Sequence, residues 1–440
     1  MSDFDLVIDN ATYIVTSDSK NRVLKDCAIA IKDKKIVAIA SAGTLKGSKT
    51  YDAKDKLIAP GLINTHTHLA MSLLRGWAEG VNLQGFLERV WAAEGLIMNP
   101  KNVALGSQLG ALESLLAGTT TALDMYLYPD AAHKGAASTG IRHITGPLFF
   151  DFTGLDGLNW EERLEIAKKW EQVLQEVGGP DVPPYLMPHS TYTVSPDHLL
   201  EIGKLAKQMG ASISIHISEN LGENDDVAKR FGKSPTALLQ ESGILESHTL
   251  LGHGVHLSDE DIELLVEAGA AVAHCPGSNL KLGSGIADIK KYQSRNLSVA
   301  LGTDGCSSSN DLDMWAVMRV AANLYAQSNG PENLKAGEIF RMATIGAAKA
   351  LGLESSIGSI EVGKSADLIS IDLNKAHLIP LHDVFAQLVF AAGRGDVSDV
   401  WVDGIQVIAN GSSTLIDFSQ LSKEVDVVVQ TLRKEFNEQG

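Results

Sequence analysis

The stretch PGLINTHTHLA, residues 60–70, combines a short apolar run with two histidines that are separated by a single residue. Side chains alternate between the two faces of a β-strand, so a strand here directs His66 and His68 to the same side. Two neutral imidazoles presented together form half of a tetrahedral or trigonal-bipyramidal metal site. Alone, this pattern also fits strand histidines that are hydrogen-bonded core residues, so the rest of the chain must decide between the two interpretations.

The rhythm of the chain changes at this stretch. From Ile58 onward, short apolar runs alternate with helical segments, which is typical of βα units around a parallel sheet. The predicted strands are 57–68, 119–125, 142–145, 185–189, 212–217, 249–255, 271–274 and 298–302. The predicted helices between them include 100–116, 160–177, 196–208 and 259–267. Eight such units in roughly 300 residues predict a TIM-like (β/α)8 barrel with insertions. The alternative, a doubly wound open sheet, lacks a GxGxxG after the first strand.

Both ends of the chain are rich in short β-segments. The predicted strands are 5–10, 13–16, 27–32 and 35–39 near the start, and 367–372, 387–390, 400–402 and 405–408 after a helical stretch at 336–351. We expect the two sets to form one small β-sandwich domain, built from residues 1–57 and 356–440. Residues 58–355 would be the catalytic barrel, and 419–437 a closing helix with a solvated face.

The composition of the chain limits the kinds of molecule that the protein can bind. The 440 residues carry a formal net charge of −17 without a Lys/Arg cluster, which argues against nucleic acid but not against a small neutral ligand. Three scattered cysteines are typical of free thiols in a reducing compartment. The first ten residues lack a secretory signal, and no apolar run is long enough to span a bilayer. We expect a cytoplasmic protein with a small-molecule substrate and neither a nucleic-acid nor a membrane partner.

Three further predicted strands end in residues that can bind metal or move protons. One delivers His216, with Glu219 three residues beyond it, and another delivers His253, with His256 nearby. A third leads into Asp304. Catalytic groups of a (β/α)8 barrel gather at the carboxyl ends of its strands, and core packing does not explain why several strands end alike. The sequence therefore predicts a metal site, with His256 as a structural residue.

These motifs carry a family resemblance that covers nearly the whole chain. NTHTH, HISEN, GHGVH and LGTDG, in this order and spacing, resemble the amidohydrolase superfamily, in its nucleobase and s-triazine aminohydrolase branch. The stretches SNLKLGSGIA (278–287), RMATIGAAKALGL (341–353) and GSIEVGKSADLISID (358–372) extend the match. Within the branch, the motifs are most similar to those of 5′-methylthioadenosine/S-adenosylhomocysteine deaminases. The resemblance implies a barrel flanked by a β-sandwich, one Zn²⁺ or Fe²⁺ ion, and a homo-oligomer.

The resemblance also implies the ligands of that ion. By matching motifs they are His66, His68, His216 and Asp304. Relatives with two metals bridge them through a carboxylated lysine at the end of the fourth strand, where this chain reads MPHS (187–190). A mononuclear site follows.

Roles in hydrolytic deamination follow from the same likeness. A metal ion can lower the pKa of water from 15.7 to about 7. Asp304 would take the water proton as general base, Glu219 would protonate the ring nitrogen, and His253 would orient the nucleophile and stabilise developing charge. His189 would bind the substrate and Glu94 its ribose hydroxyls. The implied reaction releases ammonia from the 6-amino group of an adenosine-type nucleoside.

The substrate and the activity have alternatives. The stretch ITGPLFFDFTGLDG (144–157) has no arginine to clamp a carboxylate, which favours 5′-methylthioadenosine or adenosine over S-adenosylhomocysteine. Another aminohydrolase, acting on guanine-like or cytosine-like rings or on s-triazines, is the first rival. A ring-opening amidohydrolase, which normally needs the bridging lysine, is the second. A scaffold that lost its chemistry is the third, and retention of the ligand set with Glu219 and His253 argues against it.

Overall fold

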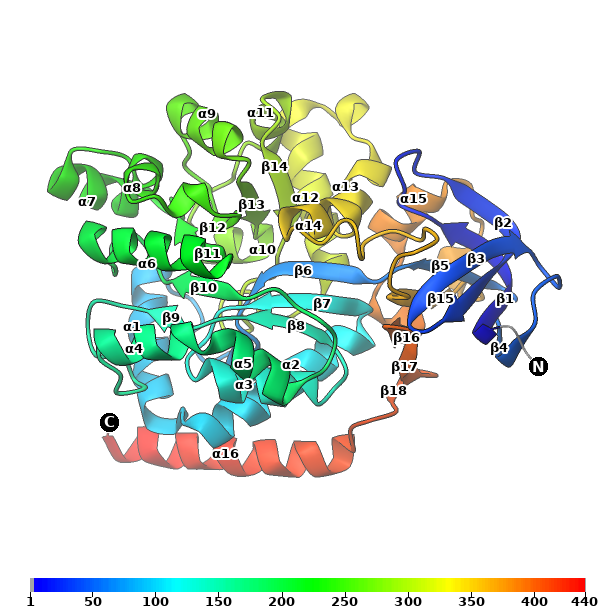
Figure 1. Cartoon of the computed structure of the whole chain (residues 1–440), viewed down its shortest axis with the longest axis horizontal. Helices are drawn as coiled ribbons and strands as arrows, with labels where there is room; N and C mark the ends of the chain where they lie inside the picture. Colours follow the sequence, from blue (N-terminus) through cyan, green and yellow to red (C-terminus); the bar gives the residue numbers. More distant parts are fainter. Residues whose placement is uncertain (1–3, 440) are drawn as a thin grey trace.

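A layer of parallel strands occupies the centre of the molecule. The computed structural model describes residues 4–439. The parallel strands are β6 (Leu62–Thr67), β7 (Thr119–Asp124), β8 (Arg142–Thr145), β9 (Leu148–Phe149), β10 (Tyr185–Pro188), β11 (Ser212–Ile217), β12 (Thr249–His253), β13 (Ala271–His274) and β14 (Ser298–Leu301). They form a three-stranded and a six-stranded sheet, each in chain order. At one junction Thr65 donates to the carbonyl of Leu301; at the other, a Cβ on Gly146 would fall 2.0 Å from the carbonyl oxygen of Tyr185. This arrangement is consistent with a TIM-like barrel (Figure 1).

Helices connect these strands and cover them on the outside (Figure 1). They are α1 (Leu83–Ile97), α2 (Pro100–Leu116), α3 (Pro129–Ala137), α4 (Trp160–Lys168), α5 (Trp170–Val177), α6 (Pro196–Met209), α7 (Leu221–Phe231), α8 (Pro235–Glu241), α9 (Asp259–Ala268), α10 (Pro276–Lys281), α11 (Ile289–Ser294), α12 (Met314–Asn329), α13 (Ala336–Met342) and α14 (Ile345–Ala350). Short turns of helix are η1 (Leu69–Leu74), η2 (Ile244–Glu246), η3 (Pro331–Asn333), η4 (Ala376–Leu378) and η6 (Arg394–Asp396). The single helix predicted over 160–177 is two helices. The chain bends at Lys169 so that the indole of Trp170 is buried and donates to a strand carbonyl.

The two ends of the chain meet in a second, nine-stranded sheet. Its strands are β1 (Phe4–Val15), β2 (Val23–Lys32), β3 (Lys35–Ser41), β4 (Gly47–Asp52), β5 (Lys56–Pro60), β15 (Leu368–Asp372), β16 (Val397–Val402), β17 (Ile405–Ala409) and β18 (Ser412–Ser413). β5 lies between β1 and β15, so the early strands and the late strands join side by side in one sheet (Figure 1). This sheet has an apolar cluster separate from the main core, and Ile8, Ile58 and Trp401 belong to it.

Two predictions for the C-terminal region need correction. The prediction of a strand at 387–390 was wrong. The short helix α15 (Val384–Ala386) is followed by η5 (Gln387–Ala391), a turn of π-helix that buries Leu388 and Val389. A short apolar run does not distinguish a strand from a buried helix. The closing helix is α16 (Phe418–Gln439), but one of its faces is buried against α1 and α2. Across residues 4–439, no helix has the length and apolarity needed to cross a bilayer.

A buried ion network joins the nine-stranded sheet to the parallel strands. Arg142, at the start of β8, contacts the carboxylates of Asp367 at 3.1 Å and Asp403 at 2.5 Å, and it donates to the carbonyl of Asp181. The three charged side chains are all less than 10% exposed. Because charges at this depth are stable only when paired, this network ties together segments far apart in the chain.

Replacing Arg142 by methionine keeps a long side chain but leaves two carboxylates buried without a cation. Loss of one partner of a buried ion pair costs about 3–5 kcal/mol, so we expect the urea-unfolding midpoint to fall accordingly. The matched control is Lys207→Met, which removes an exposed pair with Glu246 and should leave the midpoint unchanged. An Arg142→Met protein as stable as the wild type would contradict a stabilising role for the network.

Candidate metal centre

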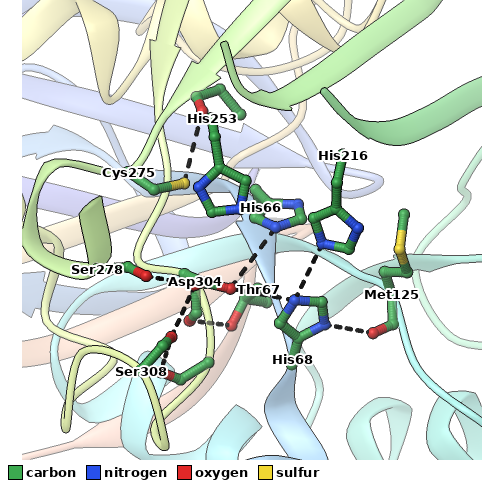
Figure 2. Close-up of polar contacts among 12 residues, drawn as sticks. His66, Thr67, His68, Met125, His216, His253, Cys275, Ser278, Asp304 and Ser308 are labelled. Carbon is green, nitrogen blue, oxygen red and sulfur yellow. Dashed lines mark hydrogen bonds and ion pairs between the residues drawn. The ribbon is translucent and has the colours of Figure 1, made fainter. Parts of the chain in front are cut away.

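Five ligand-type side chains meet at the carboxyl ends of the parallel strands. His66 and His68 come from β6 and the residue after it, His216 from β11, His253 from the end of β12, and Asp304 from the loop after β14. All five residues are less than 10% exposed. Figure 2 shows the four imidazoles gathered around the carboxylate. The Nε2 atom of His68 lies 3.1 Å from Asp304 Oδ1 and 3.4 Å from His216 Nε2, and His66 Nε2 lies 3.7 Å from the same carboxylate oxygen.

The donor set fits a divalent cation. His66 is completely buried, and neither of its ring nitrogens has a hydrogen-bond partner. A buried polar group without a partner is unfavourable, and a metal ion would satisfy it. His68 and His216 use Nδ1 to donate to the carbonyls of Met125 and His189, which turns each Nε2 toward the cluster. Such second contacts are typical of metal-binding histidines.

Asp304 is held in a similar way. Its Oδ2 atom accepts hydrogen bonds from the hydroxyls of Ser278 at 2.6 Å and Ser308 at 2.7 Å. Its Oδ1 atom is left facing the histidines (Figure 2). Two fixed donors on one oxygen orient the carboxylate, so that the other oxygen is free to act as a ligand.

The charge states of the cluster suit a cation. Burial and neighbouring imidazoles push the pKa of His66 and His216 well below the ordinary value, which favours the neutral, metal-binding form. Burial opposes charge on both His68 and Asp304. Their mutual contact nevertheless raises the pKa of His68 to about 9 and holds the pKa of Asp304 well below its usual range. Positive charge is therefore favoured beside this carboxylate.

The backbone is strained where these strands end. Ser218, His253 and Asp304 have φ angles of 46°, 70° and 61°, in the left-handed region that side chains other than glycine rarely adopt. Each costs on the order of 1–2 kcal/mol. Strained residues persist where the surrounding structure enforces them, and they cluster at functional sites.

Glu219 and His253 lie beside the cluster. His253 Nε2 is 3.9 Å from Glu219 Oε2, and its Nδ1 hydrogen-bonds Asn279 at 2.9 Å. The hydroxyl of Ser284 donates to Glu219 Oε1, and Glu223 accepts a hydrogen bond from the Glu219 amide. Burial raises the pKa of Glu219, which favours a carboxyl that carries a proton. The sequence analysis assigned no role to Asn279 and Ser284, although both lie in SNLKLGSGIA, a stretch that belongs to the family resemblance.

Four members of the cluster line a cavity of about 190 Å³: His68, His216, His253 and Asp304. Its walls are mainly apolar: α1 contributes Leu83, Phe86, Leu87 and Val90, and the segment after β9 contributes Phe150, Phe152 and Leu155. No lysine or arginine is among the described residues that line it.

Glu94 and His189 also line this cavity. Glu94 accepts a 2.5 Å hydrogen bond from the hydroxyl of Tyr126, and burial raises its pKa to about 7. Burial and the charge of His68 lower the pKa of His189 to about 3, so its ring is neutral. His256, predicted to be structural, hydrogen-bonds the carbonyl of Ser284 and does not line the cavity. Every site residue predicted from the sequence thus lies in this one region.

The chain is similar in sequence and fold to known proteins. The sequence family described as the amidohydrolase family matches residues 57–407. The chain is 37% identical over 403 residues to the 5-methylthioadenosine/S-adenosylhomocysteine deaminase of Moorella thermoacetica, and the match covers 90% of this chain and 93% of that protein. It is 35% identical over 430 residues to the 5′-deoxyadenosine deaminase of Methanosarcina mazei, and the match covers 97% of this chain and 98% of that protein.

A solved structure extends this likeness to the fold. An adenosine deaminase from Xanthomonas campestris with bound zinc has a TM-score of 0.94 and 34% sequence identity, and the match covers 98% of this chain and 99% of that one. The family match and these relatives each span most of the chain. The protein therefore belongs to the amidohydrolase family.

Proposed function

We propose that this protein is a metal-dependent deaminase that removes the 6-amino group of an adenosine-type nucleoside. The observation that carries the proposal is the buried His66, whose ring nitrogens are both unpartnered. It lies beside His68 and Asp304, which line a largely apolar cavity together with Glu219 and Glu94. Relatives named as deaminases of methylthioadenosine, S-adenosylhomocysteine and 5′-deoxyadenosine support the same reaction.

His66, His68, His216 and Asp304 would hold one divalent cation, zinc or alternatively Fe²⁺. Imidazole and carboxylate ligands suit both metals. When bound, the ion supplies Lewis-acid chemistry that makes a water molecule nucleophilic near neutral pH. The strand β10 ends without a lysine that could bridge a second ion, so we propose a mononuclear site.

The side chains around the cluster would move the protons. The carboxyl of Glu219 donates its proton to purine N1, which makes C6 electrophilic. His253, held by Asn279, orients the attacking water, and Asp304 takes a proton from it as the C6–O bond forms. Asp304 then passes this proton to the amino group, the C6–N bond breaks, and ammonia leaves. The proton of the new hydroxyl returns to Glu219, so water and nucleoside give the 6-oxo product and ammonia.

The cavity also suggests how the rest of the nucleoside is bound. Glu94, supported by Tyr126, would accept hydrogen bonds from the ribose hydroxyls. His189 would hydrogen-bond the purine ring, with Nδ1 engaged by Ser190 and Thr193.

The 5′ substituent would be small and uncharged. The described residues that line the cavity include no cation for a carboxylate. Arg163, behind the wall near Phe150, is already paired through both terminal nitrogens with Asp156, at 2.9 and 2.7 Å. We therefore place 5′-methylthioadenosine, 5′-deoxyadenosine and adenosine ahead of S-adenosylhomocysteine.

We also propose the organisation of the chain. Residues 58–355 would form the catalytic (β/α)8 barrel, and residues 1–57 and 356–440 a small β-sandwich domain with the terminal helix. The nine-stranded sheet supports this division, and β5 moves the first boundary toward its end at Pro60. We propose a homo-oligomer that acts on small molecules in the cytoplasm.

An ammonia-release screen tests the function. We expect release from 5′-methylthioadenosine, 5′-deoxyadenosine and adenosine, with kcat/KM for S-adenosylhomocysteine at least about tenfold lower because its carboxylate finds no cation. Chelation should stop the reaction and added zinc restore it. Glu219→Gln, the control, should lower kcat about 10²- to 10⁴-fold on every substrate. Release from only guanine, cytosine or s-triazines would assign the site to the rival activity, and an active metal-free protein would refute the mechanism.

Loss of Glu94 separates ribose binding from chemistry. Above the Glu94 pKa of about 7, where the carboxylate is ionised, we expect Glu94→Ala to raise KM for 5′-methylthioadenosine about 10- to 100-fold, because hydrogen bonds to a charged group contribute about 1.5–3 kcal/mol. KM for free adenine should change little, and kcat should be kept. Glu88→Gln, on the same helix but outside the cavity lining, is the matched control. Equal increases of KM for nucleoside and base would reject this role.

A further inference from the structure

Three buried polar side chains are connected in series by hydrogen bonds behind the metal-ligand cluster. Asp124 is the last residue of β7, His143 lies in β8, and His133 lies in α3. Their exposed fractions are 0%, 1% and 2%. His143 Nε2 is 3.0 Å from Asp124 Oδ2, and its Nδ1 is 3.1 Å from His133 Nδ1. None of the three lines the cavity, so the mechanism above does not use them.

The hydrogen bonds fix the tautomer of each ring. An ionised carboxylate only accepts, so Nε2 of His143 carries the proton toward Asp124. Nδ1 of His143 is then an acceptor, and Nδ1 of His133 donates to it. The two rings are stacked, with centroids 5.3 Å apart. With a neutral His143 ring, this pattern of donors and acceptors keeps every contact among the three side chains.

Asp124 and the residue after it, Met125, are hydrogen-bonded to the backbone on both sides of His68, a proposed metal ligand. Asp124 Oδ1 accepts a 2.9 Å hydrogen bond from the amide of Leu69, the residue after His68. The next residue, Met125, accepts a 2.6 Å hydrogen bond from His68 Nδ1 through its carbonyl, and its amide donates to the carbonyl of Thr67. The backbone on one side of His68 and the contact of its ring thus both depend on where Asp124 lies.

We propose that Asp124, His143 and His133 are positioning residues that orient His68 and thereby set the affinity of the site for its cation. The inference rests on the proposed metal centre, and it adds three residues that have no contact with substrate. Without the Asp124 carboxylate, the amide of Leu69 would be buried and unpaired, and the Met125 carbonyl would lose its fixed place against His68. Without His143, Asp124 would lose its one side-chain partner among the described contacts.

Zinc affinity, measured by competition with a chelator, tests this inference. Asp124→Asn keeps the size of the side chain, but its single acceptor oxygen cannot serve both the Leu69 amide and Nε2–H of His143. Loss of such a supporting group typically costs 10- to 100-fold in metal affinity, and we expect an increase of about that size in the zinc Kd. Excess zinc should restore most of kcat, and KM should stay at its wild-type value, which a general loss of packing would not produce.

A second variant and a control make the result decisive. His143→Gln should weaken zinc binding in the same direction, and it decides the matter if Asp124→Asn does not fold. His248→Gln is the matched control, because His248 hydrogen-bonds the Ala350 carbonyl just before β12, at the other end of the strands. Wild-type zinc affinity in the Asp124 and His143 variants, or an equal loss in the control, would overturn the inference. A wild-type protein that binds no zinc would instead refute the metal centre itself.

Discussion

The structure depends on one unfavourable arrangement, a set of imidazoles and a carboxylate held together away from water. His66 is the extreme case, with a completely buried ring whose nitrogens have no partner. Such a group destabilises a fold unless something binds to it, and the proposed cation, held jointly with His68, His216 and Asp304, would resolve this problem. The family to which the chain belongs and the zinc in a structural relative agree with that solution.

The rest of the protein can be understood as the support that this arrangement needs. Parallel strands bring the proposed ligands together because their carboxyl ends meet at one edge, although these residues are distant in the chain. Hydroxyls and backbone carbonyls then orient His68, His216 and Asp304, and residues in left-handed conformations complete the strand ends. The largely apolar cavity, in whose described lining no lysine or arginine occurs, suits a flat, uncharged heterocycle.

Much of this could be predicted from the sequence, because the main signals are local. The spacing of His66 and His68 determines which face they share, and apolar runs mark the strands whose ends carry the other ligands. The supporting contacts could not be predicted, because Asn279 and Glu223 find their partners only after the strands assemble. The π-helical turn at η5 was missed for a related reason: burial determines the conformation of that apolar run, and burial is a property of the whole fold.

Anomalous diffraction at the zinc absorption edge tests the central claim most directly. The account predicts a single metal peak per chain, about 2.0–2.2 Å from Nε2 of His66, His68 and His216 and from a carboxylate oxygen of Asp304. The geometry also offers a competing set, because His66, His253 and Asp304 bring ligand atoms within 4.8 Å of one another. A peak bound by His253 in place of His68 and His216, or two peaks in one site, would contradict the account.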